Sequence, residues 1–230
     1  MKAMILAAGR GERLRPLTDQ CPKPLLPIGG KPMIEHTINA LVENDITEII
    51  INLSYKGEQI RKSLGDGKRL GARLSYSDEG PEALETAGGI RRALSFFDEQ
   101  PFLVVNGDIY TDYPYAQLHT RSVSTSYLVL VANPVHHPQG DFGLDNGRVS
   151  DQAAQLFTFS GIGVYSKQLF ENLPDGRHSL APILYETIRT GTVNGELYSG
   201  IWIDVGNLQR YEAINQWFDS GKLDIETMRL

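Results

Sequence analysis

The stretch that decides the fold lies near the start of the chain and runs Met4-Ile5-Leu6-Ala7-Ala8-Gly9-Arg10-Gly11-Glu12-Arg13-Leu14-Arg15-Pro16, followed by Pro22-Lys23-Pro24-Leu25. Its apolar beginning predicts a short buried strand. Two glycines follow, and they allow the backbone to turn tightly and to approach a ligand closely. Positive charge then gathers beside backbone N–H groups, from Arg10, Arg13, Arg15 and Lys23. A glycine-rich turn with this charge is suited to binding phosphate groups.

The two common phosphate-binding motifs do not fit this stretch. A dinucleotide-binding fingerprint needs a third glycine at the position where the chain has Leu14. A Walker A loop needs Gly-Lys followed by Ser or Thr, but the Gly-Lys pairs at 30–31, 67–68 and 221–222 are followed by other residues. The loop therefore belongs to a different class of phosphate site.

The composition favours a globular protein that binds a small anionic ligand. The chain has 230 residues, of which 41% are hydrophobic, and a formal net charge of −6. This charge argues against a nucleic-acid-binding surface, which is usually a basic patch. The single cysteine, Cys21, excludes an internal disulfide, and the chain shows neither an 18-residue apolar run nor a signal-type leader. We expect a soluble, cytoplasmic protein that contacts neither membranes nor nucleic acids.

Strand and helix patterns alternate through the first 112 residues. Strands are predicted at 4–8, 48–53, 74–77 and 102–106, and helices at 32–44, 56–64 and 86–97. Strands that alternate with helices form right-handed βαβ units, so we expect an α/β fold with a doubly wound, mostly parallel central sheet.

The remainder of the chain is richer in strand patterns. Strands are predicted at 126–132, 142–149, 157–165 and 200–204, and helices at 180–189 and 207–218. Within this part, Asn146-Gly147 predicts a hairpin turn. The polar residues 219–230 are expected to form a loosely held tail.

Two isolated aspartates follow predicted strands. Asp108 comes just after the strand at 102–106, and Asp204 ends a short apolar run before Val205-Gly206. Ligands of open parallel sheets bind beyond the carboxyl ends of the strands, which places both carboxylates near the loop at 9–13. Because Mg²⁺ prefers carboxylate, phosphate and water oxygens, the pair predicts a Mg²⁺ site. The alternative is that each aspartate starts a turn or caps the next helix.

These residues match a known family. The signature Leu-Ala-x-Gly-x-Gly-x-Arg-Leu-x-Pro, with Pro-Lys-Pro and Lys-Pro-Met-Ile after it, stands at 6–16, 22–24 and 31–34. Further matches occur at 84–89, 106–108, 142–143, 160–162 and 202–206. The chain therefore resembles the sugar-1-phosphate nucleotidylyltransferases to about residue 218. The resemblance implies one Rossmann-like domain at 1–218, with a nucleotide-binding half at 1–112 and a sugar-binding half at 113–218.

The resemblance also implies the chemistry of the site. Members of this family join a nucleoside triphosphate to a sugar 1-phosphate, whose phosphate oxygen attacks the α-phosphorus as pyrophosphate leaves, with Mg²⁺ bridging the phosphates. By this resemblance Arg13 binds the β- and γ-phosphates and Lys23 the α-phosphate, while Asp108 and Asp204 bind the Mg²⁺. The expected nucleotide-binding positions are Ala8, Gly9, Gly11, Glu79, Thr86, Gly88 and Asn106, and the expected sugar-binding positions are Gly143, Ser160 and Gly161. Glu79 is the candidate acceptor for the N3–H donor of uracil.

Three features depart from the usual pattern of the family. Glu85-Thr86 stands where many members have Gly-Thr, which alters a contact to the base. Residues 150–154 replace a Glu-Lys-Pro segment, so the usual sugar-phosphate lysine is missing. We expect Arg15, Arg148, Mg²⁺ or backbone N–H groups to meet that charge. The chain also ends soon after the closing helix, without the extension through which many members associate, so a monomer is expected.

The expected substrates follow from a finer resemblance. The compact length and residues 85–89 and 141–145 resemble most the members that transfer UMP from UTP to N-acetylmuramic acid 1-phosphate, in the recycling of cell-wall peptidoglycan. Mannose or glucose 1-phosphate is the alternative sugar. A catalytically silent nucleotide-sugar-binding module is a further alternative, because a fold does not guarantee chemistry.

Overall fold

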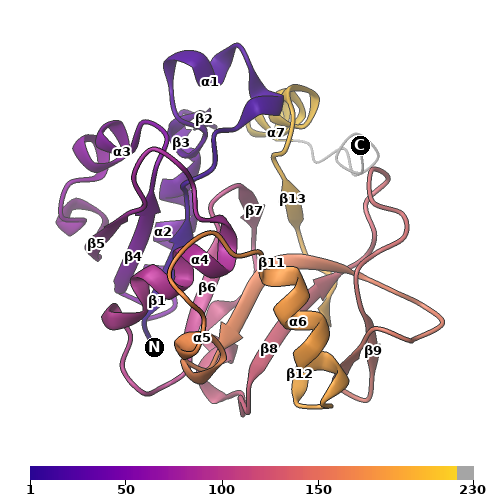
Figure 1. Ribbon diagram of the computed structural model, residues 1–230. Coiled ribbons are helices and arrows are strands. Elements are labelled where there is room, and N and C mark those ends of the chain that lie inside the picture. The colour runs from indigo at the N-terminus through magenta and orange to yellow at the C-terminus, as the bar shows by residue number, and fades with distance from the viewer. Residues whose placement is uncertain (222–230) are drawn as a thin grey trace.

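A nine-stranded β-sheet runs through both halves of the chain in the computed structural model, which describes residues 1–221 (Figure 1). Its strands are β1 (Ala3–Leu6), β4 (Glu48–Leu53), β5 (Arg73–Asp78), β6 (Phe102–Asn106), β8 (Ser126–Val131), β9 (Gly143–Asp145), β10 (Arg148–Ser150), β11 (Thr158–Tyr165) and β12 (Val193–Tyr198). They lie in the order β5-β4-β1-β6-β11-β8-β12-β10-β9. Two further strand pairs are β2 (Pro27–Ile28) with β3 (Lys31–Pro32), and β7 (Ile109–Thr111) with β13 (Trp202–Asp204).

Helices cover both faces of this sheet. The α-helices are α1 (Leu17–Gln20), α2 (Met33–Glu43), α3 (Gly57–Leu64), α4 (Glu85–Ala93), α5 (Gln168–Glu171), α6 (Leu180–Arg189) and α7 (Leu208–Ser220). Short 3₁₀ helices occur at Glu12–Leu14, Lys23–Leu25, Lys68–Leu70, Leu94–Phe96 and Tyr115–Thr120. The longer predicted helices are all present, with ends that differ from the predictions by a few residues.

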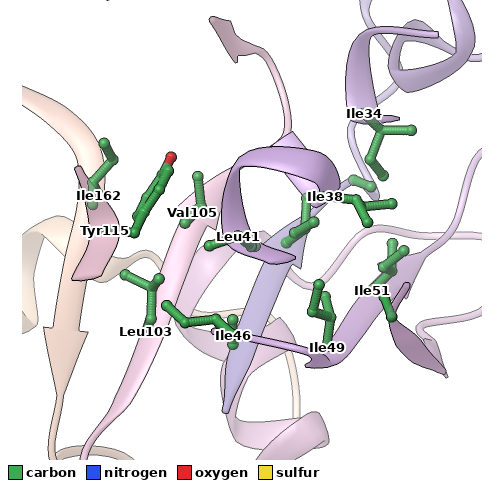
Figure 2. Packing of buried hydrophobic residues seen from close by; sticks show 14 of the residues in the cluster. Ile34, Ile38, Leu41, Ile46, Ile49, Ile51, Leu103, Val105, Tyr115 and Ile162 are labelled. Atoms are coloured by element: carbon green, nitrogen blue, oxygen red, sulfur yellow. The ribbon is translucent and has the colours of Figure 1, made fainter. Parts of the chain in front are cut away.

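The first four strands of the sheet are parallel, and alternation of their side chains explains the two helical layers. On one face, Ile5 lies in a buried cluster with apolar residues of α2 and α3. Figure 2 shows Ile38 and Leu41 of α2 over this face. On the opposite face, Met4 lies in a second cluster with residues of α4 and α6. Since successive residues of a strand point to opposite faces, this pattern forms the doubly wound arrangement that the sequence predicts.

Antiparallel pairing dominates the second half of the sheet. Strand β11 joins the two halves by pairing antiparallel with β6, and β8 then pairs antiparallel with β11 and parallel with β12. The predicted hairpin is present between β9 and β10, and its turn residues Asn146 and Gly147 have φ of 49° and 79°. Both values suit a type I′ turn. The α/β fold is confirmed, with its fully parallel part confined to the first half.

Helix α7 closes the described part of the chain. Its N-terminus is capped by the Asn207 side chain, which accepts a hydrogen bond from the backbone N–H of Arg210, and Gly221 ends it with φ of 65°. The helix packs through Ile214 against Ile203 and Val205, beside β13. Residues 219–220 of the predicted tail are thus helical, and its remainder from 222 lies outside the described residues. None of the helices within residues 1–221 has the length and apolar character needed to cross a membrane.

Candidate active site

The carboxyl ends of β1, β4 and β6 open into a cavity of about 360 Å³, called here the first cavity. Asn52 and Asn106, at the ends of β4 and β6, form part of its wall. Seven predicted site residues line it: Ala8, Gly9, Lys23, Glu79, Thr86, Asn106 and Asp108. The sheet therefore gathers these residues at one edge, as expected for an open parallel sheet.

A second cavity of about 270 Å³ adjoins the first. The two cavities are neighbours because Leu6, Thr86 and Asn106 line both of them. Gly161 also lines the second cavity, as predicted, and has φ of 80°. A Cβ atom on this glycine would lie 2.4 Å from the side-chain nitrogen of Asn106, so the position requires glycine on two grounds. The two cavities thus adjoin at a shared wall.

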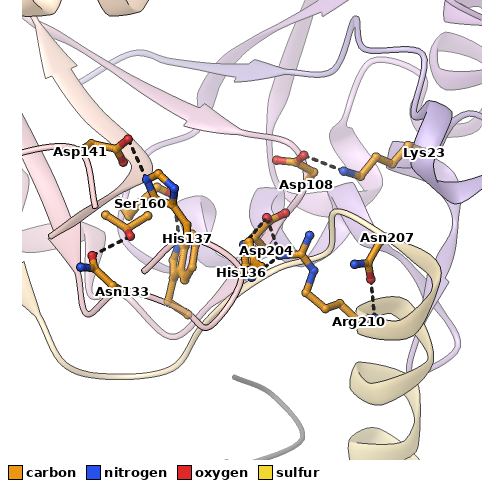
Figure 3. Close-up of polar contacts among 12 residues, drawn as sticks. Lys23, Asp108, Asn133, His136, His137, Asp141, Ser160, Asp204, Asn207 and Arg210 are labelled. Atoms are coloured by element: carbon orange, nitrogen blue, oxygen red, sulfur yellow. Dashed lines mark hydrogen bonds and ion pairs between the residues drawn. The ribbon is translucent and has the colours of Figure 1, made fainter. Parts of the chain in front are cut away.

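Lys23 and Asp108 form an ion pair in the first cavity. The Lys23 Nζ atom donates to Asp108 Oδ2 at 2.6 Å (Figure 3). The side chain of Lys23 is 11% exposed and that of Asp108 is 35% exposed. The lysine charge is therefore held at the cavity wall, where low hydration strengthens its action on an anion.

Asp204 lies beside Asp108 because β13 pairs with β7. The backbone N–H of Val205 donates to the carbonyl oxygen of Asp108 at 2.9 Å. Asp204 Oδ2 accepts a hydrogen bond at 2.9 Å from Arg210 Nη1, and the Arg210 side chain is only 3% exposed. Arg210 Nη1 also lies 2.9 Å from Nδ1 of His136. The structure thus brings the two predicted aspartates together and adds a buried arginine that the sequence analysis missed.

The histidine pair at 136–137 contacts the site through two aspartates. The pair lies in a loop outside the helices and strands. His136 Nε2 lies 3.4 Å from Asp204 Oδ2, and His137 Nε2 lies 3.0 Å from Asp141 Oδ1 (Figure 3). The loop is therefore attached to the walls of the site rather than standing free in solvent.

The donor set at the two aspartates fits a hard divalent cation. In each carboxylate the Oδ2 atom is paired with a basic side chain, Lys23 or Arg210. The Oδ1 atom has no ion pair within residues 1–221. A Cβ on Gly206 would lie 2.4 Å from Arg210 Nη2, 2.9 Å from Asp204 Oδ1 and 3.1 Å from Arg13 Nη2, so the glycine lets these three polar groups come close together. Two carboxylates suit a Mg²⁺ ion that takes its other ligands from phosphate and water. Residues 1–221 hold no cluster of three or more His, Cys, Asp or Glu arranged for a metal.

Two of the three arginines in the basic loop are paired with acidic side chains, and the third is not, within residues 1–221. Arg10 and Arg15 each lie 2.9 Å from Asp19, and their hydrogen bonds lower the pKa of that carboxyl. Arg13 is exposed and forms no ion pair with any described residue. Its guanidinium reaches the space at Gly206 instead. Of these three arginines, Arg13 therefore has the charge available for a phosphate, as the sequence predicts.

Glu79 holds the loop that forms the outer wall of the first cavity. The residue is 7% exposed. Its Oε1 accepts from Asn52 Nδ2 and its Oε2 from the backbone N–H of Leu84, both at 2.7 Å. Asn52 Oδ1 in turn accepts from the backbone N–H of Ala7 at 2.6 Å. Both oxygens of Glu79 are thus engaged by the protein, and its contact with a base stays a prediction.

Three predicted glycines have packing roles instead of lining a cavity. A Cβ on Gly88 would lie 2.2 Å from the carbonyl oxygen of Gly176, and one on Gly143 would lie 2.1 Å from the Cβ of Ala153. Gly11 has φ of 70° and packs against Lys23. None of the three lines the first or the second cavity, and the binding of the nucleotide by Gly11 and Gly88 and of the sugar by Gly143 stays a prediction.

Ser160 is engaged by the protein, and its contact with the sugar stays a prediction. It is 1% exposed, and its Oγ donates to the carbonyl oxygen of Val129 at 2.7 Å. Its own carbonyl oxygen accepts from Trp202 Nε1 at 2.9 Å. The residue therefore positions Gly161 and β13 from behind the wall of the second cavity.

Some cavity residues carry a signal that sequence reasoning passed over, and others do not. Asn52 interrupts an isoleucine-rich strand near its carboxyl end, at the same level as Asn106 of β6 on the other side of β1. That signal could have found it. Arg177 lies in an irregular loop between α5 and α6, and Arg210 lies on α7. No motif marks either arginine.

Comparisons with known proteins identify the family of the chain. Residues 2–220 match the family described as nucleotidyl transferase. A structure of a putative glucose-1-phosphate thymidylyltransferase from Bacillus anthracis, in complex with sucrose, superposes with a TM-score of 0.83 at 23% identity and covers 99% of this chain and 98% of that one. That likeness shows the fold. The chain belongs to the nucleotidyl transferase family.

Two bacterial relatives make the match more specific. The N-acetylmuramate alpha-1-phosphate uridylyltransferase of Neisseria meningitidis serogroup B is 45% identical, over 91% of this chain and 95% of the relative. The enzyme of the same name from Caulobacter vibrioides is 31% identical, over 90% of this chain and 92% of the relative. The resemblance to sugar-1-phosphate nucleotidylyltransferases is confirmed, and it extends over almost the full length of both relatives.

Proposed function

We propose that the protein transfers UMP from UTP to N-acetylmuramic acid 1-phosphate, forming UDP-N-acetylmuramic acid and pyrophosphate. The observation that carries this proposal is the pair of adjoining cavities that share Thr86 and Asn106, with Lys23 and Asp108 in the wall of the first. Asp204 lines a separate hollow, and its strand is held next to Asp108 by the backbone hydrogen bond of Val205. The near full-length similarity to two uridylyltransferases supports the choice of substrates.

The chain's own residues bind and orient the two substrates for a direct displacement. UTP occupies the first cavity and the sugar 1-phosphate the second, so that a phosphate oxygen of the sugar faces the α-phosphorus. As the new P–O bond forms, the bond to pyrophosphate breaks. Lys23 stabilises the charge that develops on the α-phosphate, and Arg13 stabilises that on the leaving pyrophosphate. Holding both substrates in this geometry supplies much of the rate.

Asp108 and Asp204 would hold Mg²⁺ in this proposal. When bound, the ion neutralises phosphate charge and activates the α-phosphorus as a Lewis acid. Before substrates arrive, the ion pair of Lys23 with Asp108 compensates both charges. A cytoplasmic location, a role in peptidoglycan recycling and a monomeric state belong to the same proposal. Sedimentation at micromolar concentration tests the last, with a single 25.5 kDa species expected.

The test is a panel of substrates. Pyrophosphate release is measured for UTP, CTP, GTP and dTTP, each with the 1-phosphates of N-acetylmuramic acid, glucose and mannose. We expect the highest kcat/KM with UTP and N-acetylmuramic acid 1-phosphate, loss of activity in EDTA, and recovery with Mg²⁺. Comparable turnover with glucose or mannose 1-phosphate would move the assignment to another sugar. No pyrophosphate with any pair would favour a silent binding module.

A further inference from the structure

The second cavity poses a problem of charge for the proposed sugar. N-acetylmuramic acid carries a lactyl group at O3 that ends in a carboxylate. The charged residue in the wall of this cavity is Asp141, and no Lys, Arg or His contributes to that wall among residues 1–221. A carboxylate placed there without a cation is unfavourable, because burying an unpaired charge is costly. The cation has to come from the rim.

Arg177 is the cation at that rim. It lines the first cavity together with Thr86, a residue that also lines the second, and Ser179, two residues further along the chain, lines the second. The Arg177 side chain is 71% exposed, and its Nη2 lies 2.8 Å from Glu85 Oε1. Lys23, the other cation in the walls of the two cavities, is already paired with Asp108.

The backbone beside Arg177 is held against α4 by hydrogen bonds, so the position of its Cα atom is fixed. The carbonyl oxygen of His178 accepts from the backbone N–H groups of Ala87 and Gly88, at 3.0 and 3.1 Å. The His178 N–H donates to the carbonyl oxygen of Leu84 at 3.0 Å. The flexible part is therefore the side chain of Arg177, which can move between partners while its backbone stays at the boundary of the cavities.

Glu85 adds a second observation. It has φ of 60°, a conformation that non-glycine residues adopt uncommonly, and it stands where the family resemblance expects glycine. The chain thus keeps an acidic side chain at a position suited to glycine, and that side chain holds Arg177. A carboxylate that occupies the arginine in this way marks where a substrate carboxylate can replace it.

The two arginines expected from the sequence to meet sugar-phosphate charge lie elsewhere. Arg15 is paired with Asp19 and Glu12. Arg148 lines a separate hollow beside the β9–β10 hairpin, with residues of the end of α6. Neither lines the first or the second cavity.

We propose that Arg177 binds the lactyl carboxylate of the sugar, with Glu85 as its partner in the absence of substrate. This inference rests on the proposed function and makes Arg177 a residue that determines sugar specificity. Arg177 donates a charge-assisted, bidentate pair of hydrogen bonds that suits a carboxylate and that the same sugar without its lactyl group cannot accept. Binding of the sugar thus exchanges one carboxylate for another on the same guanidinium.

The test compares two products that differ only in the lactyl group, UDP-N-acetylmuramic acid and UDP-N-acetylglucosamine. Their Kd values are measured by titration calorimetry for the wild type, Arg177→Met and the matched control Arg148→Met. We expect the wild type to prefer the lactyl product by about tenfold or more, the scale of a charged hydrogen bond. Arg177→Met should lose that preference, and Arg148→Met should keep it. Glu85→Gln should bind the lactyl product more tightly than the wild type, because the competing carboxylate is gone.

Steady-state rates with N-acetylmuramic acid 1-phosphate separate the possible failures. Arg177→Met should lower kcat/KM for this sugar by the factor lost in binding, with KM for UTP unchanged. A preference retained in Arg177→Met would overturn the inference. Equal weakening of both products would overturn it too, since Arg177 would then contact the nucleotide. A wild type that turns over another sugar 1-phosphate but not this one would overturn the proposed function itself.

Discussion

Replacing Arg210 by methionine tests whether this buried arginine positions Asp204. The Arg210 side chain is 3% exposed and its hydrogen bond to Asp204 Oδ2 is 2.9 Å long. Its removal frees the carboxylate to rotate and leaves it only the longer contact of 3.4 Å with His136. Groups that orient metal ligands typically contribute 10- to 100-fold in metal affinity or activity. We therefore expect the Mg²⁺ concentration for half-maximal activity to rise about tenfold or more in Arg210→Met.

The same substitution should lower stability by a limited amount. Breaking a fully buried ion pair costs about 3–5 kcal/mol, but the Asp204 side chain is 22% exposed and can be hydrated. A loss of about 2 kcal/mol follows, the size of one charged hydrogen bond. For a chain of this length that loss lowers Tm by about 4–8 °C.

Two measurements decide the case, Mg²⁺ activation by pyrophosphate release and thermal unfolding by circular dichroism. Arg189→Met is the matched control, since Arg189 pairs with Asp151 at 3.0 Å on the surface of α6. The control should change unfolding by less than about 1 kcal/mol and leave Mg²⁺ activation unchanged. Arg210→Lys should recover part of the activation. A lower Tm with unchanged Mg²⁺ activation would refute the positioning role and leave only a structural one.

Three further predictions concern Lys23, Glu79 and His36. Lys23→Ala should lower kcat by about 10²-fold or more in the pyrophosphate assay, because one charge on the transition state is lost, and an unchanged kcat would contradict the catalytic assignment. Glu79→Gln should raise KM for UTP and reduce unfolding free energy by about 1–3 kcal/mol, since its amide cannot accept from both Leu84 and Asn52; retained stability in a urea titration would count against the network. Burial lowers the pKa of His36, so its contribution to stability is complete above the unfolded pKa of about 6.5 and is lost as pH falls below it. His36→Gln should flatten the Tm profile over this range, and a parallel profile would disprove the linkage.

Elements bounded by local signals could be predicted from the sequence. The predicted bounds of β4, β6 and α6 agree with the structure to the residue. Each is a strongly patterned apolar segment, and local patterning decides its limits.

Strand β12 is not predicted from the sequence, because the contacts that stabilise it come from residues distant in the chain. Its segment Val-Asn-Gly-Glu-Leu-Tyr carries polar residues in the interior of the sheet. A Cβ on Gly195 would lie 2.5 Å from the carbonyl oxygen of Leu128, so glycine is needed for close pairing. Glu196 is accepted because Gln117 donates to it at 2.8 Å and Tyr127 at 3.1 Å. The Tyr127 partner of this carboxylate lies about 70 residues away in the sequence. No local sequence pattern predicts such a contact.

The site shows the same division. Motif residues such as Lys23, Asp108 and Gly161 lie where the sequence places them. For the glycines at 88 and 143, a motif does not tell whether the missing Cβ makes room for a ligand or for another part of the chain. The sequence does not predict that Arg177 and Arg210 contribute to the site, because their partners, Glu85 and Asp204, come from other segments.

The wall shared by the two cavities has a consequence for how such enzymes diversify. Since Thr86 and Asn106 line both cavities, a substitution there that alters the proposed nucleotide site also alters the proposed sugar site. Substitutions at these two positions are therefore expected to change the preference for the nucleotide and the preference for the sugar together. The constraint does not apply to Arg177 and Glu85 at the rim. They line the first cavity but not the second, and they contact each other. Laboratory evolution toward new sugars has most freedom at that rim, with the shared wall left intact.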